Sequence, residues 1–552
     1  MADQWDDTYD VVVAGTGVAA LSAAITAADS GLRVVMLEST DRWGGSSAMS
    51  GGGLWLPNNP LMQRDRVGDS RGDALAYLEA TVGDCGPSTS RARKEAFVDG
   101  VAGFVNLAER LGVRFTRAAD YPDYYPELPG GKIGRAVEVE PFDVHAIGDW
   151  WTTSRGQDGV PAPVKTDDFW LLSRAWSTPS GLVRGARVVF RVLGSLARRQ
   201  KAVGMGAAVT AALLDVAVKQ GVQIRLSSPV TELVVDGGRV VGVVTTVGGR
   251  TRRVEARRGV VLGGGGFDHN GEWRERYQGV DGKDSSGSRG NLGTAIEVAQ
   301  KIGAAIDLMD DAWWGASIPS PTPDGSAAFL VSERSMPYSI IVDASGSRFA
   351  NESESYVDLG HHMFERFETV PGACWMVTDV RHTRKYLRSY AMDPRATKAM
   401  TEAGILVKAP TLDDLARRIK VDPAALRATV DTFNGYCRAG VDHDFKRGSS
   451  AYDRYYGDPL VHPNPNLGTI EKGPFTAVQV VPGDLGTKGG VVTDEHARVL
   501  REDGSVIEGL YASGNNTASV MGRTYPGPGS TLGPAAVFGH LAARHIASTT
   551  KG

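Results

Sequence analysis

The sequence predicts an α/β protein, built as a discontinuous Rossmann-like domain with an inserted α+β domain. Residues 10–38 follow the order strand, glycine turn, alanine-rich helix and second strand, which is the βαβ unit of nucleotide-binding folds. Two later segments, 258–267 and 509–516, again combine a strand with a glycine turn. The residues from about 317 to 484 differ in composition, with Pro, aromatic and His residues, and we assign them to an insertion.

The overall composition is that of a globular protein. The 552 residues carry 60 Lys and Arg against 64 Asp and Glu, a formal charge of −4, which excludes a disordered or a nucleic-acid-binding chain. The 69 glycines exceed the usual share of about 7%, as close approaches of the backbone to a nucleotide require. The three cysteines lie far apart in the sequence, which predicts no disulfide framework and a reducing compartment.

The N-terminal unit has the residue types that a dinucleotide requires. A helix is predicted over residues 18–30, and Gly31 ends it. Before the helix, Gly15 permits the turn and Gly17 lets the backbone approach a pyrophosphate, while Ala20 allows close packing of helix and strand. The unpaired N–H groups at the start of this helix then face the phosphates.

The second strand and the loop after it indicate which dinucleotide binds. Glu38 ends the strand 33–38, at 38 − 15 = 23 residues after Gly15. A carboxylate here accepts the ribose hydroxyls and repels a 2′-phosphate, which argues against NADP. The Gly- and Ser-rich segment 40–53 is too long for an ordinary turn, and a flexible surface loop is the alternative. We expect this segment to wrap the ribityl phosphate of a flavin, so the predicted cofactor is FAD.

Two later segments complete the predicted FAD-binding domain. Segment 258–267 ends in glycines but lacks a following Ala-rich helix, so it is not a second nucleotide-binding fold. Segment 509–516 precedes a Gly- and Pro-rich loop and an apolar helix, 533–549, whose N-terminus points at a ligand and stabilises charge at the flavin's pyrimidine end. The predicted cofactor-binding residues are Gly15, Gly17, Ala20, Glu38, Gly44, Gly45, Ser46, Ser47, Ser50, Gly51, Gly52, Gly53, Gly264, Gly514, Asn515 and Leu532.

These segments divide the chain into two domains. We assign residues 1–316 and 485–552 to the FAD-binding domain and residues 317–484 to the substrate (catalytic) domain. Within the substrate domain, helices are predicted around 411–419 and 423–436.

One segment, 169–201, carries seven basic residues and no acidic one, interleaved with apolar and aromatic residues. A basic amphipathic segment of this kind lies on an anionic membrane surface, and a surface helix or a subunit contact is the alternative. The N-terminal segment lacks an apolar signal core, and no run of about 18 apolar residues exists. We therefore expect a cytoplasmic protein, and segment 169–201 leaves peripheral contact with the inner face of the cell membrane open beside the surface helix and the subunit contact.

Three tyrosines lie in distinctive motifs. Tyr124 follows Tyr-Pro-Asp, Tyr356 follows Arg-Phe-Ala-Asn-Glu-Ser-Glu-Ser, and Tyr525 opens Tyr-Pro-Gly-Pro-Gly. Each motif alone is compatible with a core aromatic ring or a loop. Together with the FAD fingerprint, and over nearly the whole chain, they resemble the 3-ketosteroid Δ1-dehydrogenases. These belong to the flavoprotein family that also includes fumarate reductases.

The resemblance implies an FAD-dependent enzyme that introduces a 1,2-double bond into a 3-ketosteroid. It implies that Tyr356 takes the C2 proton, that Tyr124 supports its ionisation, and that a hydride passes from C1 to flavin N5. It also implies that Tyr525 and the N–H of Gly529 hold the C3 carbonyl. Tyr121 and Tyr125 leave the choice of the supporting tyrosine open. The electron acceptor, a quinone or a dye-like molecule, and the oligomeric state are not determined.

Three alternatives stay open. A soluble fumarate-reductase-like flavoprotein would bind a dicarboxylate through Arg and His, although the tyrosine motifs have no role in that chemistry. The residues that could serve it are Arg334, Arg348, Arg523, His361 and His362. A 3-ketosteroid 4-ene (5α) dehydrogenase would desaturate C4–C5 of the same steroids. A non-catalytic flavin redox sensor would carry a reactive Cys motif, which the sequence lacks.

Two further features are predicted to be inert. His361 and His362 are expected to cap or pack, because no carboxylate or third His has metal-ligand spacing, so no metal is predicted. The pair Asp310 and Asp311 is expected to form a solvated turn.

Overall fold

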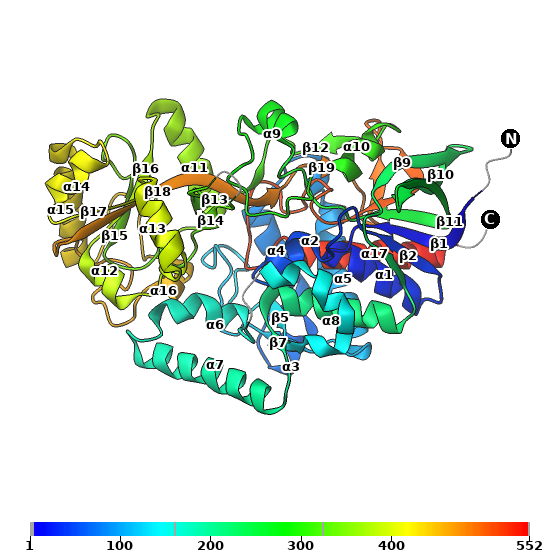
Figure 1. Cartoon of the computed structure of the whole chain (residues 1–552), viewed down its shortest axis with the longest axis horizontal. Coiled ribbons are helices and arrows are strands. Elements are labelled where there is room, and N and C mark those ends of the chain that lie inside the picture. Colours follow the sequence, from blue (N-terminus) through cyan, green and yellow to red (C-terminus); the bar gives the residue numbers. More distant parts are fainter. Residues whose placement is uncertain (1–4, 159–161, 323–324, 550–552) are drawn as a thin grey trace.

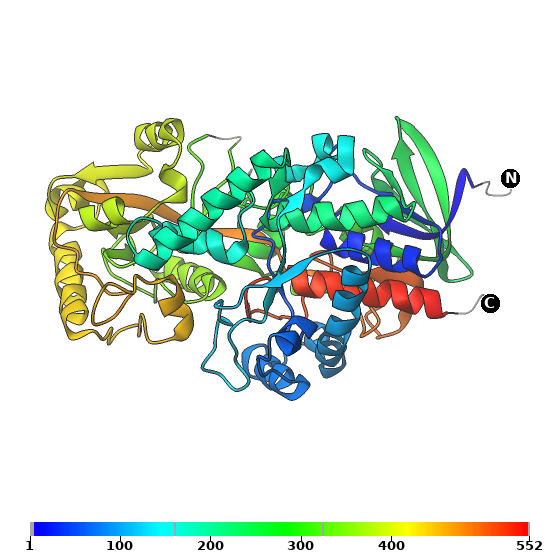
Figure 2. The same cartoon turned by 90° about the horizontal axis from the view of Figure 1, so that it is seen from below.

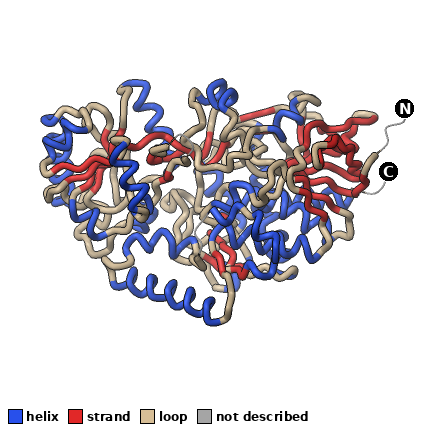
Figure 3. Tube along the Cα trace, viewed as in Figure 1, coloured by secondary structure: helices blue, strands red, loops and turns tan. Residues whose placement is uncertain are grey.

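The computed structural model describes residues 5–158, 162–322 and 325–549. Within these ranges the molecule has two lobes, and both ends of the chain lie in the lobe that contains the largest sheet (Figure 1). Figure 3 shows the strands of this sheet gathered at the end of the molecule where both termini lie. Residues 1–4 and 550–552, which lie at the two ends of the predicted FAD-binding domain, are outside the described residues.

The large sheet has eight strands in the order β20-β21-β11-β1-β2-β8, with β10 paired to β11 and β9 to β10. Five strands, β1, β2, β8, β11 and β21, pair in parallel, as the βαβ interpretation requires. The predicted α/β class is therefore confirmed. The strands are β1 (Asp7–Ala14), β2 (Val34–Leu37), β8 (Gln223–Arg225), β9 (Val230–Asp236), β10 (Arg239–Val247), β11 (Arg250–Leu262), β20 (Arg498–Leu500) and β21 (Val506–Ala512).

The helix α1 (Val18–Asp29) packs against α8 (Met205–Lys219) and α17 (Leu532–Ser548). Its first ten residues are all buried, because their small side chains let other segments approach closely. The Ser22 hydroxyl donates to the carbonyl of Ala536 on α17 at 2.6 Å. Figure 2 shows α17, in red, along the underside of this lobe. The predicted helices 18–30 and 533–549 are thus confirmed.

The second lobe is built on a six-stranded antiparallel sheet in the order β14-β13-β18-β16-β15, with β17 paired to β18. The long strand β18, orange in Figure 1, runs from this lobe toward the large sheet. The predicted helices 411–419 and 423–436 are confirmed as α14 and α15. The strands are β13 (Ala312–Ile318), β14 (Ala328–Phe329), β15 (Ser339–Val342), β16 (Cys374–Thr378), β17 (Leu406–Ala409) and β18 (Phe475–Thr487). The helices are α11 (Tyr356–Thr369), α12 (Val380–Lys385), α13 (Pro394–Glu402), α14 (Leu412–Arg418), α15 (Pro423–Ala439) and α16 (Ala451–Tyr456).

The remaining described helices and strands are short, apart from α4 and α5. The helices are α2 (Gly45–Met49), α3 (Pro60–Arg64), α4 (Arg71–Thr81), α5 (Arg91–Arg110), α6 (Thr166–Leu171), α9 (Gly271–Gln278) and α10 (Thr294–Gln300). The strands are β3 (Leu54–Trp55), β4 (Phe115–Arg117), β5 (Ala136–Val139), β6 (Phe142–Asp143), β7 (Ala202–Val203), β12 (Ile306–Asp307) and β19 (Gly490–Val491). The predicted domain limits at 317 and 484 fall inside β13 and β18, so the inserted sheet extends beyond both.

The basic segment 169–201 contains one long helix, α7 (Pro179–Ala197), at the edge of the molecule (Figure 1). Its apolar side chains face outward: Leu182 is 64% exposed and Phe190 is 72% exposed. Two of its basic residues instead face the protein, where Arg184 and Arg191 pair with Asp168 at 3.1 and 2.8 Å. No helix in the described ranges combines the length and the apolar character that crossing a bilayer would need.

Candidate active site

One cavity of about 800 Å³ extends from the glycine turn after β1 to the boundary between the two lobes. It is lined by the ends of β1, β2 and β11, by the start of α17, and by residues that precede or begin α11. Loops at the carboxyl ends of parallel strands are where α/β folds bind ligands. The cavity has two parts, a narrow one along the predicted dinucleotide site and one bounded by tyrosines.

The first part is built from the N-terminal βαβ unit. Gly15 has a φ of +100°, and a Cβ on it would lie 2.4 Å from the carbonyl oxygen of Gly263, so the turn requires glycine. Gly17 caps α1, where the N–H of Val18 donates to the Ser47 hydroxyl at 3.1 Å. These residues bring the start of α1 to the cavity wall. That geometry suits a pyrophosphate.

Glu38 lies at the cavity wall immediately after β2 and is nearly buried. Its carboxylate accepts hydrogen bonds from the Thr16 hydroxyl at 2.5 Å and from the N–H of Thr40 at 3.1 Å. The hydroxyls of Ser39 and Thr40 also donate to it, at 3.3 and 3.0 Å, so Oε1 accepts three hydrogen bonds and Oε2 accepts one. A carboxylate oxygen has about two acceptor sites, so Oε2 is the atom that retains capacity for a ribose hydroxyl.

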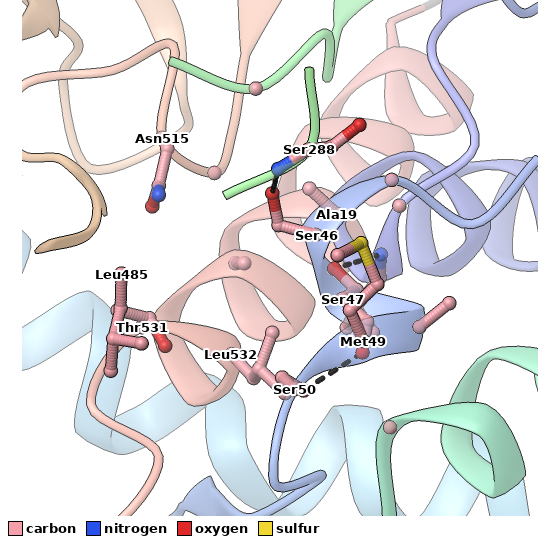
Figure 4. Close-up of a pocket in the computed structure, with 18 of the residues that line it drawn as sticks. Ala19, Ser46, Ser47, Met49, Ser50, Ser288, Leu485, Asn515, Thr531 and Leu532 are labelled. Carbon is pink, nitrogen blue, oxygen red and sulfur yellow. Dashed lines mark hydrogen bonds between the residues drawn. The ribbon is translucent and has the colours of Figure 1, made fainter. Parts of the chain in front are cut away.

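The Gly- and Ser-rich segment folds over the cavity as a loop containing α2. Figure 4 shows the Ser46 hydroxyl directed at Ser288, whose N–H donates to it at 2.8 Å. The side chain of Asn291 donates to the same hydroxyl at 2.9 Å. Gly45 has a φ of +52°, lines the cavity, and has no atom within 4 Å of where its Cβ would stand. The segment therefore leaves open space that a ligand can fill, and its contacts with Ser288 and Asn291 speak against the alternative of a flexible surface loop.

All but two of the predicted cofactor-binding residues line the cavity. The two exceptions are Ala20 and Gly44. Ala20 packs behind the turn, where a Cβ on Gly263 would lie 3.0 Å from its own Cβ, so its role is the close packing of helix and strand. Gly44 has a φ of +102° and precedes α2, and its N–H donates to Thr16 at 2.9 Å. Ala20 thus has the packing role that the sequence predicts for it, and Gly44 supports the backbone beside the cavity.

Several lining residues were missed by the sequence analysis. They include Thr16, Met205, Gly263, Gly265, Ser288, Asn291, Leu485 and Thr531. Gly263 and Gly265 stand in the glycine run beside the predicted Gly264 and could have been found from it. Ser288 and Asn291 carry no sequence signal, since only the fold brings them to Ser46.

The second part of the cavity contains the three predicted tyrosines. The rings of Tyr124 and Tyr356 have centroids 5.5 Å apart, those of Tyr124 and Tyr525 5.1 Å, and those of Tyr356 and Tyr525 4.7 Å. All three line the cavity and are at most 5% exposed. Three residues from distant parts of the chain thus form one phenol cluster.

The neighbouring tyrosines of the first motif behave differently. The hydroxyl of Tyr125 donates to Asp358 at 2.9 Å, and Tyr125 is not among the cavity-lining residues. Tyr121 lines the cavity, but its hydroxyl bonds to that of Tyr456. Of Tyr121, Tyr124 and Tyr125, Tyr124 is the one whose ring contacts that of Tyr356 in the part of the chain that the structure describes.

Further tyrosines of α16 extend the cluster, and the sequence analysis did not single them out. Tyr452 lies 4.3 Å from Tyr124 between ring centroids, and Tyr455 stacks on Tyr121 at 4.6 Å. Their spacing of three, with Tyr456 next, places phenols along a short helix.

Burial controls the ionisation of these phenols. Burial, followed by the proximity of Tyr124 and Tyr525, raises the pKa of Tyr356 well above its ordinary value. Burial also raises the pKa of Tyr525, although contacts with Tyr356 and with the N–H of Gly529 oppose it. Tyr356 is the first residue of α11, where the helix dipole favours negative charge by about 0.3–1 kcal/mol.

Gly529 occupies a position that only glycine allows. Its φ is +94°, and a Cβ would lie 2.2 Å from the carbonyl oxygen of Gly53. The loop that contains Tyr525 therefore packs closely against the end of the Gly- and Ser-rich segment 40–53. A hydrogen bond adds to this contact, because the N–H of Trp55 donates to the carbonyl of Gly529 at 3.1 Å.

Among the described residues that line the cavity, none is Arg, Lys or His. Arg334 donates to the carbonyls of Glu352 and Glu354, Arg348 pairs with Glu352 at 2.7 Å, and Arg523 pairs with Asp310 at 2.8 Å. His362 bonds Glu354 at 2.8 Å. The cationic groups that a dicarboxylate requires are therefore engaged elsewhere.

The two acidic residues predicted to form a solvated turn separate. Asp310 is exposed, but Asp311 is 1% exposed and bonds His361 at 2.8 Å and Lys488 at 3.2 Å. The prediction is wrong for Asp311, because the fold buries it between Lys488 and His361. No group of three or more metal-ligating side chains is found within the described ranges.

Comparison with known proteins identifies relatives along the full chain. A family model described as "FAD binding domain" matches residues 10–532. The chain is 43% identical to the 3-oxosteroid 1-dehydrogenase of Mycolicibacterium smegmatis, over 98% of this chain and 97% of that protein. It is 36% identical to the 4-oxocyclohexanecarboxylate 2-dehydrogenase of Sinomonas cyclohexanicum, over 99% of this chain and 94% of that protein. The crystal structure of 3-ketosteroid delta1-dehydrogenase from Sterolibacterium denitrificans, in complex with 1,4-androstadiene-3,17-dione, superposes with a TM-score of 0.91 at 36% identity, covering 98% of this chain and 100% of that one.

Proposed function

The chain belongs to the FAD binding domain family, and we propose that it is an FAD-dependent 3-oxosteroid 1-dehydrogenase, which introduces a 1,2-double bond into a 3-ketosteroid. The observation that carries this proposal is the meeting of Tyr124, Tyr356 and Tyr525 in a cavity that continues into a dinucleotide cradle. Phenols without a neighbouring cation suit a neutral ketone, because they bind a carbonyl without burying a formal charge.

The residues present fit FAD. Gly15, Gly17 and the start of α1 would hold the pyrophosphate, and Glu38 would hold the ribose of the adenosine. The loop 44–53 and the start of α17 would hold the flavin half. When bound, FAD supplies the acceptor for the hydride that leaves C1.

The chain's own residues prepare the substrate. The hydrogen on C2 becomes acidic only if the oxygen at C3 is stabilised as negative charge develops on it. The Tyr525 hydroxyl and the Gly529 N–H are two such donors, and each is worth about 3–4 kcal/mol in a dry site. Tyr356 accepts the C2 proton at its phenol oxygen. Tyr124, whose ring contacts Tyr356, stabilises the phenolate as a hydrogen-bond donor.

Ionising the base is the costly step. A free phenol with a pKa near 10 costs about 4 kcal/mol to ionise at pH 7, and burial raises the pKa of Tyr356 further. We expect kcat/KM to rise with pH by up to about tenfold per unit in the neutral to alkaline range, because the deprotonated phenol is the active form. Steady-state rates between about pH 6 and pH 9 check this. A profile that falls over this range would contradict a phenol base.

The direct test is anaerobic mixing of the holoenzyme with androst-4-ene-3,17-dione. Bleaching of the flavin and a product lighter by two hydrogens, with the new double bond at C1–C2, is the expected result. A 4-ene product from a 5α-steroid would support 4-ene dehydrogenation instead, and oxidation of a reduced dye by fumarate would support fumarate reduction. If no steroid bleaches the flavin, the proposal fails.

We further propose that α7 binds the surface of an anionic membrane, which would hold a cytoplasmic enzyme at the inner face of the cell membrane. Two observations support this. The side chains of Leu182, Phe190 and Leu196 are 64%, 72% and 65% exposed. The exposed basic residues Arg198 and Arg199 follow directly at the end of the helix, where they can meet anionic headgroups. A quinone dissolved in that membrane is then the electron acceptor that this location favours.

Flotation with vesicles of phosphatidylcholine and phosphatidylglycerol tests the membrane contact. We expect the wild type to float and the variant Leu182→Ser/Phe190→Ser/Leu196→Ser to bind at least about tenfold less, because each buried apolar side chain contributes about 1.5–3 kcal/mol. Leu460→Ser, a change at a residue that is 54% exposed elsewhere, is the matched control and should float. A wild type that stays at the bottom as a dimer would show that a second copy covers α7.

A further inference from the structure

A second, smaller space of about 20 Å³ adjoins the main cavity. Four residues line both, Gly514, Asn515, Thr531 and Ala535, so the small space opens beside the start of α17. It is large enough for about one water molecule. Its position places it next to whatever part of the cofactor lies against the start of α17.

The charged side chains that line the small space are all cationic. Arg93 and Lys488 line it, and none of its described lining residues is acidic. Both cationic side chains are buried, Arg93 at 2% and Lys488 at 0% exposure. Burial lowers the pKa of Arg93, but only to about 10, so it stays charged at neutral pH. The N-terminus of α17 adds the positive end of a helix dipole.

Lys488 is held by a counter-ion that lies outside this space. Its ammonium group lies 3.2 Å from Asp311, which does not line either cavity, and 4.9 Å from the centre of the Trp313 ring. Although burial raises the pKa of Asp311, Lys488 and His361 lower it to about 2, so the carboxylate stays ionised. Burial lowers the pKa of Lys488, and the Asp311 carboxylate opposes that shift. Lys488 therefore lines the small space while its counter-ion lies outside it.

Trp313 points to a ligand here. It lines the small space, is 2% exposed, and its indole N–H has no hydrogen-bond partner within the described part of the chain. A buried donor without a partner costs about 1–3 kcal/mol. A bound water or a carbonyl oxygen of the cofactor would satisfy it.

We propose that Lys488, fixed by Asp311, is a positioning residue that stabilises the negative charge which the pyrimidine end of the flavin acquires on reduction. The inference rests on the proposed function insofar as FAD occupies the main cavity. Hydride transfer brings two electrons and one proton to the flavin, so the reduced ring carries one negative charge unless a second proton joins it. A cation and a helix N-terminus beside the ring favour the anion and so favour reduction.

The test uses the holoenzyme without steroid and the variant Lys488→Met, which keeps an unbranched side chain one atom shorter and removes its charge. At a fixed potential set by a reference dye, we expect the ratio of reduced to oxidised flavin to fall about tenfold, which corresponds to about 30 mV for a two-electron couple. We also expect the protons taken up per two electrons to rise from about one toward two, because the anion is no longer favoured. A loss of packing alone would not change this proton count.

Two further variants keep the test decisive. Lys488→Met leaves Asp311 buried without its partner, so Lys488→Met/Asp311→Asn serves if the single variant does not fold, and it should shift the ratio in the same direction by at least about threefold. Lys94→Met is the matched control. Lys94 is 4% exposed, pairs with Glu79 at 3.2 Å and lines neither space, so its loss should leave both readouts unchanged.

Unchanged ratio and proton count in a folded, FAD-containing Lys488 variant would overturn the inference while leaving steroid dehydrogenation intact. Equal shifts in Lys94→Met would overturn it as well. A wild type that fails to oxidise steroids but shows the shift on losing Lys488 would refute the proposed function and keep the inference.

Discussion

Replacing Tyr356 with Phe should lower kcat/KM by about 10²–10⁴-fold, the usual contribution of a general base. The substitution removes one oxygen from a ring that is packed against Tyr124 and Tyr525, so the cavity shape and the FAD content should persist. Deuterium at C2 of the steroid should also stop exchanging with solvent, because no other group would accept that proton. Rates, FAD absorbance and mass spectrometry of recovered substrate measure these three results.

The matched control is Tyr386→Phe. The Tyr386 hydroxyl is buried and donates to Asp458 at 2.6 Å, but the residue does not line the cavity. Its loss should cost stability without affecting the chemistry. Near-normal turnover in Tyr356→Phe, with the C2 exchange retained, would show that another residue is the base.

Replacing Tyr525 with Phe should lower kcat by about 10²–10³-fold, because one of two donors to the developing oxyanion is lost. Ketone binding in the ground state should weaken less, by about 0.5–1.5 kcal/mol, since a neutral hydrogen bond contributes only that much. The separation of the two effects is the signature of a donor that acts mainly in the transition state. Steady-state kinetics and a spectral titration of the oxidised enzyme with steroid measure them.

The second donor cannot be removed by a side-chain change. An alanine at position 529 would place its Cβ 2.2 Å from the carbonyl oxygen of Gly53 and would displace both loops. Tyr525→Phe is therefore the clean experiment on the oxyanion site. Equal losses in binding and in kcat/KM, with kcat unchanged, would assign Tyr525 to substrate binding alone.

Tyr356→Phe and Tyr525→Phe should have different effects because the two phenols lie in different surroundings. Tyr356 begins α11, so the helix dipole acts on its ionised form, while Tyr525 lies beside the N–H of Gly529, which opposes the effect of burial on its pKa. The proposed function assigns the two phenols different tasks, so Tyr356→Phe should show the loss of a proton acceptor and Tyr525→Phe the loss of a hydrogen-bond donor. The ring of Tyr124 contacts the rings of both.

The local features of this protein could be predicted from short stretches of sequence. The strand, turn and helix of residues 10–38 depend on neighbours within about thirty positions, so the glycine spacing and the Ala-rich helix were sufficient to predict them. The same holds for helices such as α15, whose start at Asp422 and Pro423 and end at Gly440 are marked by their own residues. The catalytic tyrosines were predicted only through resemblance to a family, because no local pattern separates them from core aromatic rings.

Which side chains come into contact depends on the folding of distant segments against one another. The fold showed this in three places. It separated Tyr124 from Tyr121 and Tyr125, which lie within five positions of one another but point to different partners. It also buried Asp311 against Lys488, at a sequence separation of 177 residues, and turned the apolar face of α7 outward. Sequence periodicity shows that a helix has two faces, but the packing of distant segments decides which face is covered. Side-chain direction and long-range proximity are properties of the folded chain as a whole.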